Sequence, residues 1–203
     1  VVTAAIQQIM SGHDDMQGGF SQAPKFPQES LLFLLLQAAE RNPDPEVLEA
    51  LTVTLDAMAR GGIHDQVGGG FHRYSIDNGW LVPHFEKMLY NQAHLARAYL
   101  QAWRLTGKPR FRRVAVQTLD YVLRDMTSEQ GGFYSATDAD SEGGEGRFFL
   151  WTIGQVRQVL EGPDAELVIE LFGLSDQGNF EGSNILHRPV SVAEHAEYHG
   201  VPE

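Results

Sequence analysis

Short loops rich in glycine and aromatic residues recur along this chain, and each separates stretches whose apolar residues follow a helical period. The copies are Gly18-Gly19-Phe20, Gly68-Gly69-Gly70-Phe71, Gly131-Gly132-Phe133 and the weaker Gly178-Asn179-Phe180. Their phenylalanines are roughly 45 to 60 residues apart, which suits one helical hairpin with its connection. We therefore expect an array of similar helical hairpins whose loops gather at one end, where their polar residues can form a site.

Composition narrows the choice of partners. The chain has 203 residues, enough for one domain with a sizeable core, and a net charge of −12, which repels phosphate groups. Because of this charge, we do not expect nucleic acid as a partner. We also expect no membrane partner, since the longest apolar run, residues 31–36, is far too short to span a bilayer. The absence of cysteine excludes disulfides, zinc–thiolate sites and thiol catalysis.

From the sequence we assign no metal and no cofactor, and we expect a cytoplasmic location. The chain starts with Val1 inside an apparent helix, which indicates a piece of a longer protein. No linker divides it, so residues 1–203 are interpreted as a single partial domain.

Apolar residues at helical spacing predict a mostly helical chain. The expected helices cover residues 1–10, 28–40, 46–60, 84–106, 109–126, 152–160 and 163–172, with a short last helix from about residue 191. Residues typical of helix ends support these limits: Asp44 and Thr152 suit N-caps, and Gly107 suits a C-terminal stop.

Strands are expected only inside loops. Residues 63–67 can pair with residues 70–76 as a ribbon, and residues 133–136 with residues 147–151 as a hairpin. The predicted fold class is therefore all-α, built from antiparallel helical hairpins that stack into a bundle, a solenoid or a closed ring.

The densest group of chemically active residues lies between residues 64 and 90. It supplies the catalytic candidates His64, Asp65, Arg73, His84 and Glu86, and the ligand-binding candidates Tyr74, Trp80, Lys87 and Tyr90. A helix from residue 84 would carry His84, Lys87, Asn91 and His94 on one face. Imidazoles can move protons near neutral pH, and carboxylates can pair with them. A purely structural role explains single residues equally well, since carboxylates such as Glu86 are favoured at a helix start.

An acidic loop provides the last candidates. Asp138, Asp140, Glu142 and Gly143 follow the opening of a calcium-binding EF-hand loop, but Phe149 stands where that motif needs a bidentate glutamate. We therefore expect a hairpin turn over residues 141–146. Asp138 and Asp140 lie on the same side of an extended segment, and both remain catalytic candidates.

Carboxylates from different loops can serve as acid and base in glycoside chemistry, for instance Asp65 or Glu86 with Asp138 or Asp140. The aromatic residues of the loops, Trp80, Tyr74 and Trp151 among them, can stack on sugar rings or simply anchor the loops.

Four motifs resemble one known family. They are residues 58–75 (MARGGIHDQVGGGFHRYS), residues 80–90 (WLVPHFEKMLY), Gly131–Ala136 with Asp138–Glu142, and Gly18–Phe20 with Ala23–Pro27. This set resembles the YyaL-like, spermatogenesis-associated thioredoxin-like family. The resemblance implies part of an (α/α) toroid similar to six-hairpin glycosidases and N-acylglucosamine 2-epimerases. It also implies a thioredoxin-like domain and further hairpins, absent from this chain, as partners within the same protein.

Three functional hypotheses follow. The first is a carbohydrate-active site with a small sugar ligand, of the sugar epimerase or isomerase kind or of the glycosidase kind. The second is a non-catalytic scaffold that binds a peptide or sugar and serves the attached thioredoxin-like domain. The third is that the loops only hold the hairpins together, with glycines permitting tight turns.

Overall fold

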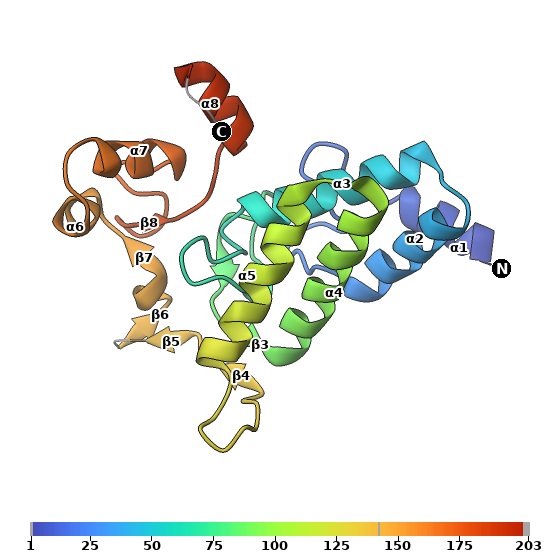
Figure 1. Ribbon diagram of the computed structural model, residues 1–203, viewed down its shortest axis with the longest axis horizontal. Helices are drawn as coiled ribbons and strands as arrows, with labels where there is room; N and C mark the ends of the chain where they lie inside the picture. The colour runs from blue at the N-terminus through green and yellow to red at the C-terminus, as the bar shows by residue number, and fades with distance from the viewer. Residues whose placement is uncertain (1, 142, 201–203) are drawn as a thin grey trace.

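The computed structural model describes residues 2–141 and 143–200, and it is mostly helical (Figure 1). Its α-helices are α1 (Val2–Met10), α2 (Glu29–Arg41), α3 (Pro45–Arg60), α4 (Leu89–Thr106), α5 (Pro109–Asp125), α6 (Ile153–Val159), α7 (Pro163–Leu171) and α8 (Val192–His199). Short strands lie in the loops: β1 (Tyr74–Ser75), β2 (Pro83–His84), β3 (Lys87–Met88), β4 (Ala136–Thr137), β5 (Asp140–Ser141), β6 (Gly144–Glu145), β7 (Leu150–Trp151) and β8 (Asn184–Ile185). A 3-10 turn, η1 (Arg147–Phe149), precedes β7. The expected all-α class, with strands confined to loops, is confirmed.

Helices α2 to α5 form two helical hairpins around the main core. The Asp44 side chain caps α3 by accepting a hydrogen bond from the backbone N–H of Glu46, and Pro45 occupies the first turn. Gly107 ends α4 in the left-handed conformation, with φ 67°. Apolar side chains of all four helices interlock in the core, among them Leu32, Leu35, Leu51, Leu55, Met58, Leu95, Tyr99, Phe111 and Val114.

The glycine-rich loops lie next to one another, as expected. Backbone pairing joins them: β3 pairs with β4 and β7 with β8 across long stretches of sequence, while β1 pairs with β2 within the second loop, all antiparallel. A bridge between Lys25 and Ser75 joins the first loop to the second. In Figure 1 the loop after α3 lies between α5 and the segment that carries α6, α7 and α8, whereas the loop between α5 and β4 projects from the lower end of the molecule.

Three local predictions were wrong, and the first two concern residues 63–94. Helix α4 begins at Leu89 rather than at residue 84, because β2 and β3 occupy the residues before it and pair with β1 and β4. His84, Lys87, Asn91 and His94 therefore do not share one helical face. The expected ribbon within residues 63–76 is reduced to a single bridge between His64 and Phe71.

The expected hairpin of residues 133–136 with 147–151 does not form either. Strand β4 pairs with β3, and β7 pairs with β8, so each half of the supposed hairpin has a partner far away in the sequence. A strand of two residues carries too little local pattern to reveal such a partner.

The last part of the chain confirms the predicted helix starts. Thr152 forms a reciprocal capping box with Gln155 at the start of α6, and Ser191 does the same with Glu194 at α8. A small second core joins α6 and α7 through Val156, among other residues. None of the helices in the described part of the chain has the length and apolar character needed to cross a membrane.

Candidate functional site

A buried ion pair lies where the second loop meets β3. Lys87 is 1% exposed, and its ammonium group donates to Asp65 Oδ2 at 2.7 Å and to the carbonyl of Gly69 at 2.8 Å. Burial lowers the pKa of Lys87, while the contact with Asp65 acts in the opposite direction. Burial, the largest single effect, would raise the pKa of Asp65, but the charge and hydrogen bond of Lys87, together with His72 and the N–H of Gly68, outweigh it, so this pKa is lowered. The 2.7 Å contact has the geometry of a buried ion pair.

Two buried histidines lie close to this pair. His72 Nδ1 donates to the carbonyl of Phe85 at 2.9 Å, so its Nε2 carries no proton in the neutral ring and can accept one. Neither ring nitrogen of His64 has a hydrogen-bond partner in the described part of the chain. Burial lowers the pKa of each imidazole to about 3, and Lys87 adds to the effect. Both rings are therefore neutral under physiological conditions.

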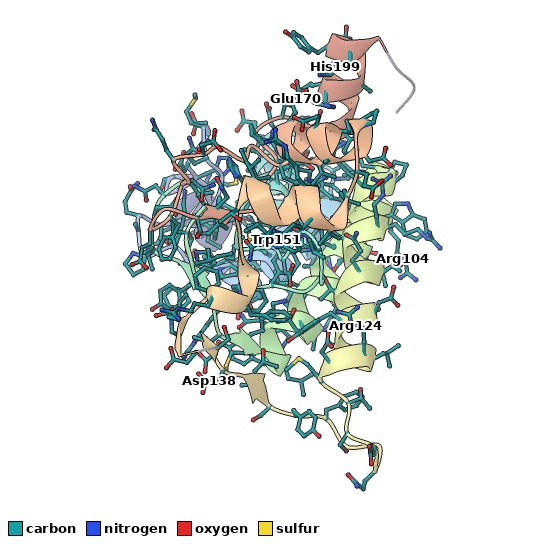
Figure 2. All side chains as sticks on the ribbon, turned by 90° about the vertical axis from the view of Figure 1, so that its left-hand side faces the viewer. Arg104, Arg124, Asp138, Trp151, Glu170 and His199 are labelled. Carbon is teal, nitrogen blue, oxygen red and sulfur yellow. The ribbon has the colours of Figure 1, made fainter. Side chains whose placement is uncertain are left out.

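These groups border a cavity of about 500 Å³. Aromatic side chains cover much of its wall, namely Phe85, Tyr121, Phe148, Phe149 and Trp151. The Lys87 ammonium lies 4.2 Å from the centre of the Tyr121 ring and 4.9 Å from that of Phe149. In Figure 2, Trp151, Asp138 and Arg124 mark three segments that border the cavity, from β7, the turn after β4, and α5.

The predicted site residues divide between this cavity and other places. His64, Asp65, Lys87 and Asp138 line the cavity. Asp140 lies exposed on β5 and is not among the lining residues.

Trp80 is fully buried in the main core, and its indole N–H donates to the carbonyl of Gln17 at 2.8 Å. Its ring therefore has no open face on which a ligand could stack.

The remaining candidates form an outer cluster on β1, β2, the residues next to them and the first turn of α4. His84 Nδ1 lies 2.8 Å from Glu145 Oε1, and its ring stacks on Tyr74 with centroids 5.2 Å apart. Arg73 donates to Glu86 Oε2 at 2.9 Å. Hydrogen bonds to Glu86, and then to Tyr90, raise the pKa of Arg73. His84 and Tyr74 border a separate, smaller cavity of about 340 Å³.

A third cavity, of about 570 Å³, meets the first at His64 and Gln66, which line both. Its wall is rich in arginines, namely Arg60, Arg110, Arg113 and Arg188. Gln66 fixes the shared wall, because its amide donates to the carbonyls of Ala59, Gly61 and His64. Burial, followed by the neighbouring arginines, lowers the pKa of Arg188.

Several residues that line the cavity were not among the candidates predicted from the sequence. His72 belongs to the motif of residues 58–75, but nothing in its spacing indicates that its Nδ1 is held by Phe85. Tyr121 comes from the middle of a helix, and its hydroxyl meets that of Thr137 at 3.1 Å. Only the β3–β4 pairing, which joins distant segments, brings Thr137 to the cavity. Glu142, part of the acidic motif, lies outside the described residues.

Chemically, the cavity offers a fixed cation, neutral proton acceptors and aromatic faces. This combination suits a small polyhydroxylated molecule, whose hydroxyl groups donate to acceptors and whose C–H faces pack on rings.

Comparison with solved structures identifies the fold of the chain. Solved structures that match it include a sugar epimerase from a ruminal bacterium, with TM-score 0.58 and 16% identity over 77% of this chain and 47% of that one. A D-mannose isomerase matches with TM-score 0.50 and 21% identity, over 61% and 32% of the two chains. The cellobiose 2-epimerase of Spirochaeta thermophila matches with TM-score 0.58 and 23% identity, over 70% and 40%. The chain thus has the fold of part of an (α/α) toroid like those of sugar epimerases and isomerases.

The sequence is also homologous to spermatogenesis-associated protein 20. The human protein is 43% identical over 196 residues, which are 87% of this chain and 25% of the human protein. The mouse protein is 41% identical over the same shares, and an uncharacterised protein of Caenorhabditis elegans is 35% identical over 87% of this chain and 27% of its own length. The chain therefore spans about a quarter of the length of these relatives. No family model matches it.

Proposed function

We propose that the cavity beside Lys87 binds a small carbohydrate and carries chemistry of the sugar isomerase or epimerase kind. The observation that supports this proposal best is a single cavity that combines a buried Lys87–Asp65 pair, the neutral imidazole of His72 and an aromatic wall. The toroid fold shared with sugar epimerases and isomerases supports the same class by analogy only.

Binding would use the aromatic wall and the acceptors together. Phe148 and Trp151 would pack on the C–H faces of a sugar ring. Asp138 would accept hydrogen bonds from its hydroxyl groups. A cavity of about 500 Å³ lies in the range of small-molecule sites, about 300 to 1,000 Å³, and suits a mono- or disaccharide.

Isomerisation and epimerisation both require a proton to leave a carbon beside a carbonyl and another to return. In the proposed roles, His72 Nε2 takes the proton, because Phe85 holds the opposite nitrogen protonated. The positive charge of Lys87 then stabilises the negative charge that develops on the substrate oxygen. Asp65 keeps Lys87 oriented and is less suited to hydrolytic acid–base work, since its Oδ2 is engaged by Lys87.

One observation favours a second candidate function, a non-catalytic binding site. A pKa of about 3 makes His72 a weak base, because general-base catalysis works best when the pKa lies near the operating pH. In this case the cavity would hold a sugar or peptide ligand for another domain of the same protein without converting it.

An experiment that measures both ligand binding and product formation distinguishes the catalytic site from the non-catalytic binding site. The full-length protein would be incubated in D2O with aldoses, ketoses and disaccharides, including D-mannose and cellobiose, and the sugars analysed by NMR. An isomerase or epimerase forms a new sugar with deuterium at the carbon beside the carbonyl, and His72→Gln abolishes this while the matched His94→Ala variant keeps it. Saturable binding without conversion supports the scaffold. A sugar panel with neither binding nor conversion overturns a carbohydrate role of either kind.

A further inference from the structure

We propose that α7 and α8 together form a binding site for a divalent transition metal ion, for which Zn²⁺ is the best fit. The ligands would be Glu170 near the end of α7, and His195 and His199 on α8. One donor atom from each side chain lies within 4.8 Å of the other two. Figure 2 shows Glu170 and His199 beside each other at the end of the molecule formed by these two helices. This site is separate from the cavity beside Lys87 and does not depend on its function.

The first line of evidence is a buried nitrogen without a partner. His195 is 8% exposed, and its Nε2 makes no hydrogen bond with the described residues. Leaving a buried polar atom unsatisfied is unfavourable, by about 1 to 3 kcal/mol, and native structures rarely keep one without a reason. A metal ion would satisfy this nitrogen directly.

The second line of evidence is the arrangement of the other donors. His199 Nε2 donates to Glu170 Oε1 at 2.8 Å, so these two groups already meet at the end of both helices. On binding, the metal ion would replace this hydrogen bond, and the Nε2 proton would be released to solvent. The rings of His195 and His199 lie with centroids 4.5 Å apart, as two histidines one helical turn apart do. Paired histidines four residues apart on one helix are a common way to hold zinc.

The donor set selects the kind of metal. Two imidazoles and one carboxylate suit Zn²⁺, which binds nitrogen and oxygen ligands at about 2.0 to 2.2 Å in a tetrahedron. Ca²⁺ and Mg²⁺ prefer oxygen ligands only, so two nitrogens disfavour them. Ligands of a tetrahedral ion at that distance lie about 3.3 Å apart. Small rotations of side chains that already lie within 4.8 Å would suffice. A water molecule or a residue from another part of the protein would take the fourth position.

The site would fasten α8 to the rest of the chain. Between α7 and α8 runs a long connection, residues 172–191, that contains only β8. A metal held by Glu170 on one side and two histidines on the other would fix the position of α8 relative to α7. Because a ligand that binds only the folded state stabilises it, Zn²⁺ should raise the melting temperature.

The test uses the full-length protein, stripped of metal with a chelator and titrated with Zn²⁺, and with Co²⁺ as a spectroscopic probe. We expect saturable binding of Zn²⁺, a tetrahedral Co²⁺ absorption spectrum, and a rise in melting temperature on Zn²⁺ addition. Mg²⁺ and Ca²⁺ should give none of these. Because partners outside the ligand set are already worth about 10- to 100-fold in affinity, His199→Ala and Glu170→Gln should each weaken Zn²⁺ binding by at least about 100-fold.

Two matched variants separate the site from unspecific binding. Glu197→Gln removes an exposed carboxylate on the same helix, and His94→Ala removes an exposed histidine from α4. Both should bind Zn²⁺ like the unmodified protein. Equal Zn²⁺ affinity in all four variants, or no saturable binding in the unmodified protein, would overturn the proposal. The melting temperature without metal checks that each variant is folded.

Discussion

The ammonium group of Lys87 donates a 2.7 Å hydrogen bond to Asp65, and both side chains are almost completely covered by the protein. The other oxygen of Asp65 accepts from the backbone N–H groups of Val67 and Gly68. The pair therefore holds the glycine-rich second loop against β3 and, through it, one wall of the cavity.

Breaking this pair from one side should destabilise the protein strongly. Lys87→Met leaves a buried, unpaired carboxylate, and we expect the free energy of unfolding to fall by about 3 to 5 kcal/mol. Denaturant titration measures the change. The exposed pair of Arg157 and Glu166 is the control, and Arg157→Ala should have a much smaller effect. Equal losses for both variants would contradict the role given to Lys87.

Stability should decrease in mild acid. His64 and His72 have pKa values of about 3 in the folded chain, against 6.5 as the ordinary value. Between pH 6.5 and 3 the unfolded chain binds more protons, so the unfolding free energy falls as the pH falls, by up to about 1.4 kcal/mol per pH unit for each histidine. Above pH 6.5 these two groups contribute no pH dependence.

The variant His64→Leu tests this assignment. It removes one proton acceptor and two unpartnered buried nitrogens, so we expect a shallower loss of stability between pH 6.5 and 4 and no loss of stability at pH 7. The same change at exposed His94 is the matched control. Melting temperatures across this pH range provide the measurement, and identical slopes for His64→Leu and the unmodified protein would refute the assignment.

The room available for a Cβ atom at two glycines, Gly146 and Gly131, gives a further prediction. Gly146 has φ +73°, and a Cβ there would lie 2.4 Å from the ring of Phe85, whose carbonyl positions His72. Gly131 has a similar φ of +84° but open space around it. Gly131→Ala should therefore cost only the left-handed strain, about 1 to 2 kcal/mol. Gly146→Ala should cost clearly more and should also reduce ligand binding.

The two tryptophans should separate stability from binding. Trp80→Phe loses the hydrogen bond to Gln17 inside the core, so the melting temperature should fall while ligand affinity stays unchanged. Trp151→Leu changes an aromatic side chain on the cavity wall and should weaken ligand binding. Thermal melts and ligand titrations of both variants test this. Weaker ligand binding by Trp80→Phe would restore Trp80 to the site.

Most helices could be predicted from the sequence because their ends carry local signals. Asp44, Thr152, Ser191 and Gly107 act within a few residues of themselves, and all four mark helix ends in the structure. The recurring glycine-rich loops likewise indicated correctly that these loops come together.

The site was harder to predict because its neighbours depend on distant pairing. Because β3 pairs with β4, Lys87 lies on a strand rather than on the helix predicted from residue 84, and Thr137 lies at the cavity. Trp80, predicted from the sequence to bind a ligand, is a core residue in three dimensions. The same holds for the proposed metal site: the spacing of His195 and His199 is visible in the sequence, but Glu170 joins them only through the packing of α7 and α8.

The proposal that the cavity beside Lys87 binds a sugar is tested most directly by locating the bound sugar. The full-length protein, labelled at its histidines, would be titrated with the panel of sugars and followed by NMR. We expect saturable shifts of the His72 ring signals, with affinity weakened by Asp138→Asn and unaffected by His84→Ala. Shifts confined to His84, affinity lost in His84→Ala but kept in Asp138→Asn, or no saturable shift with any sugar would contradict it.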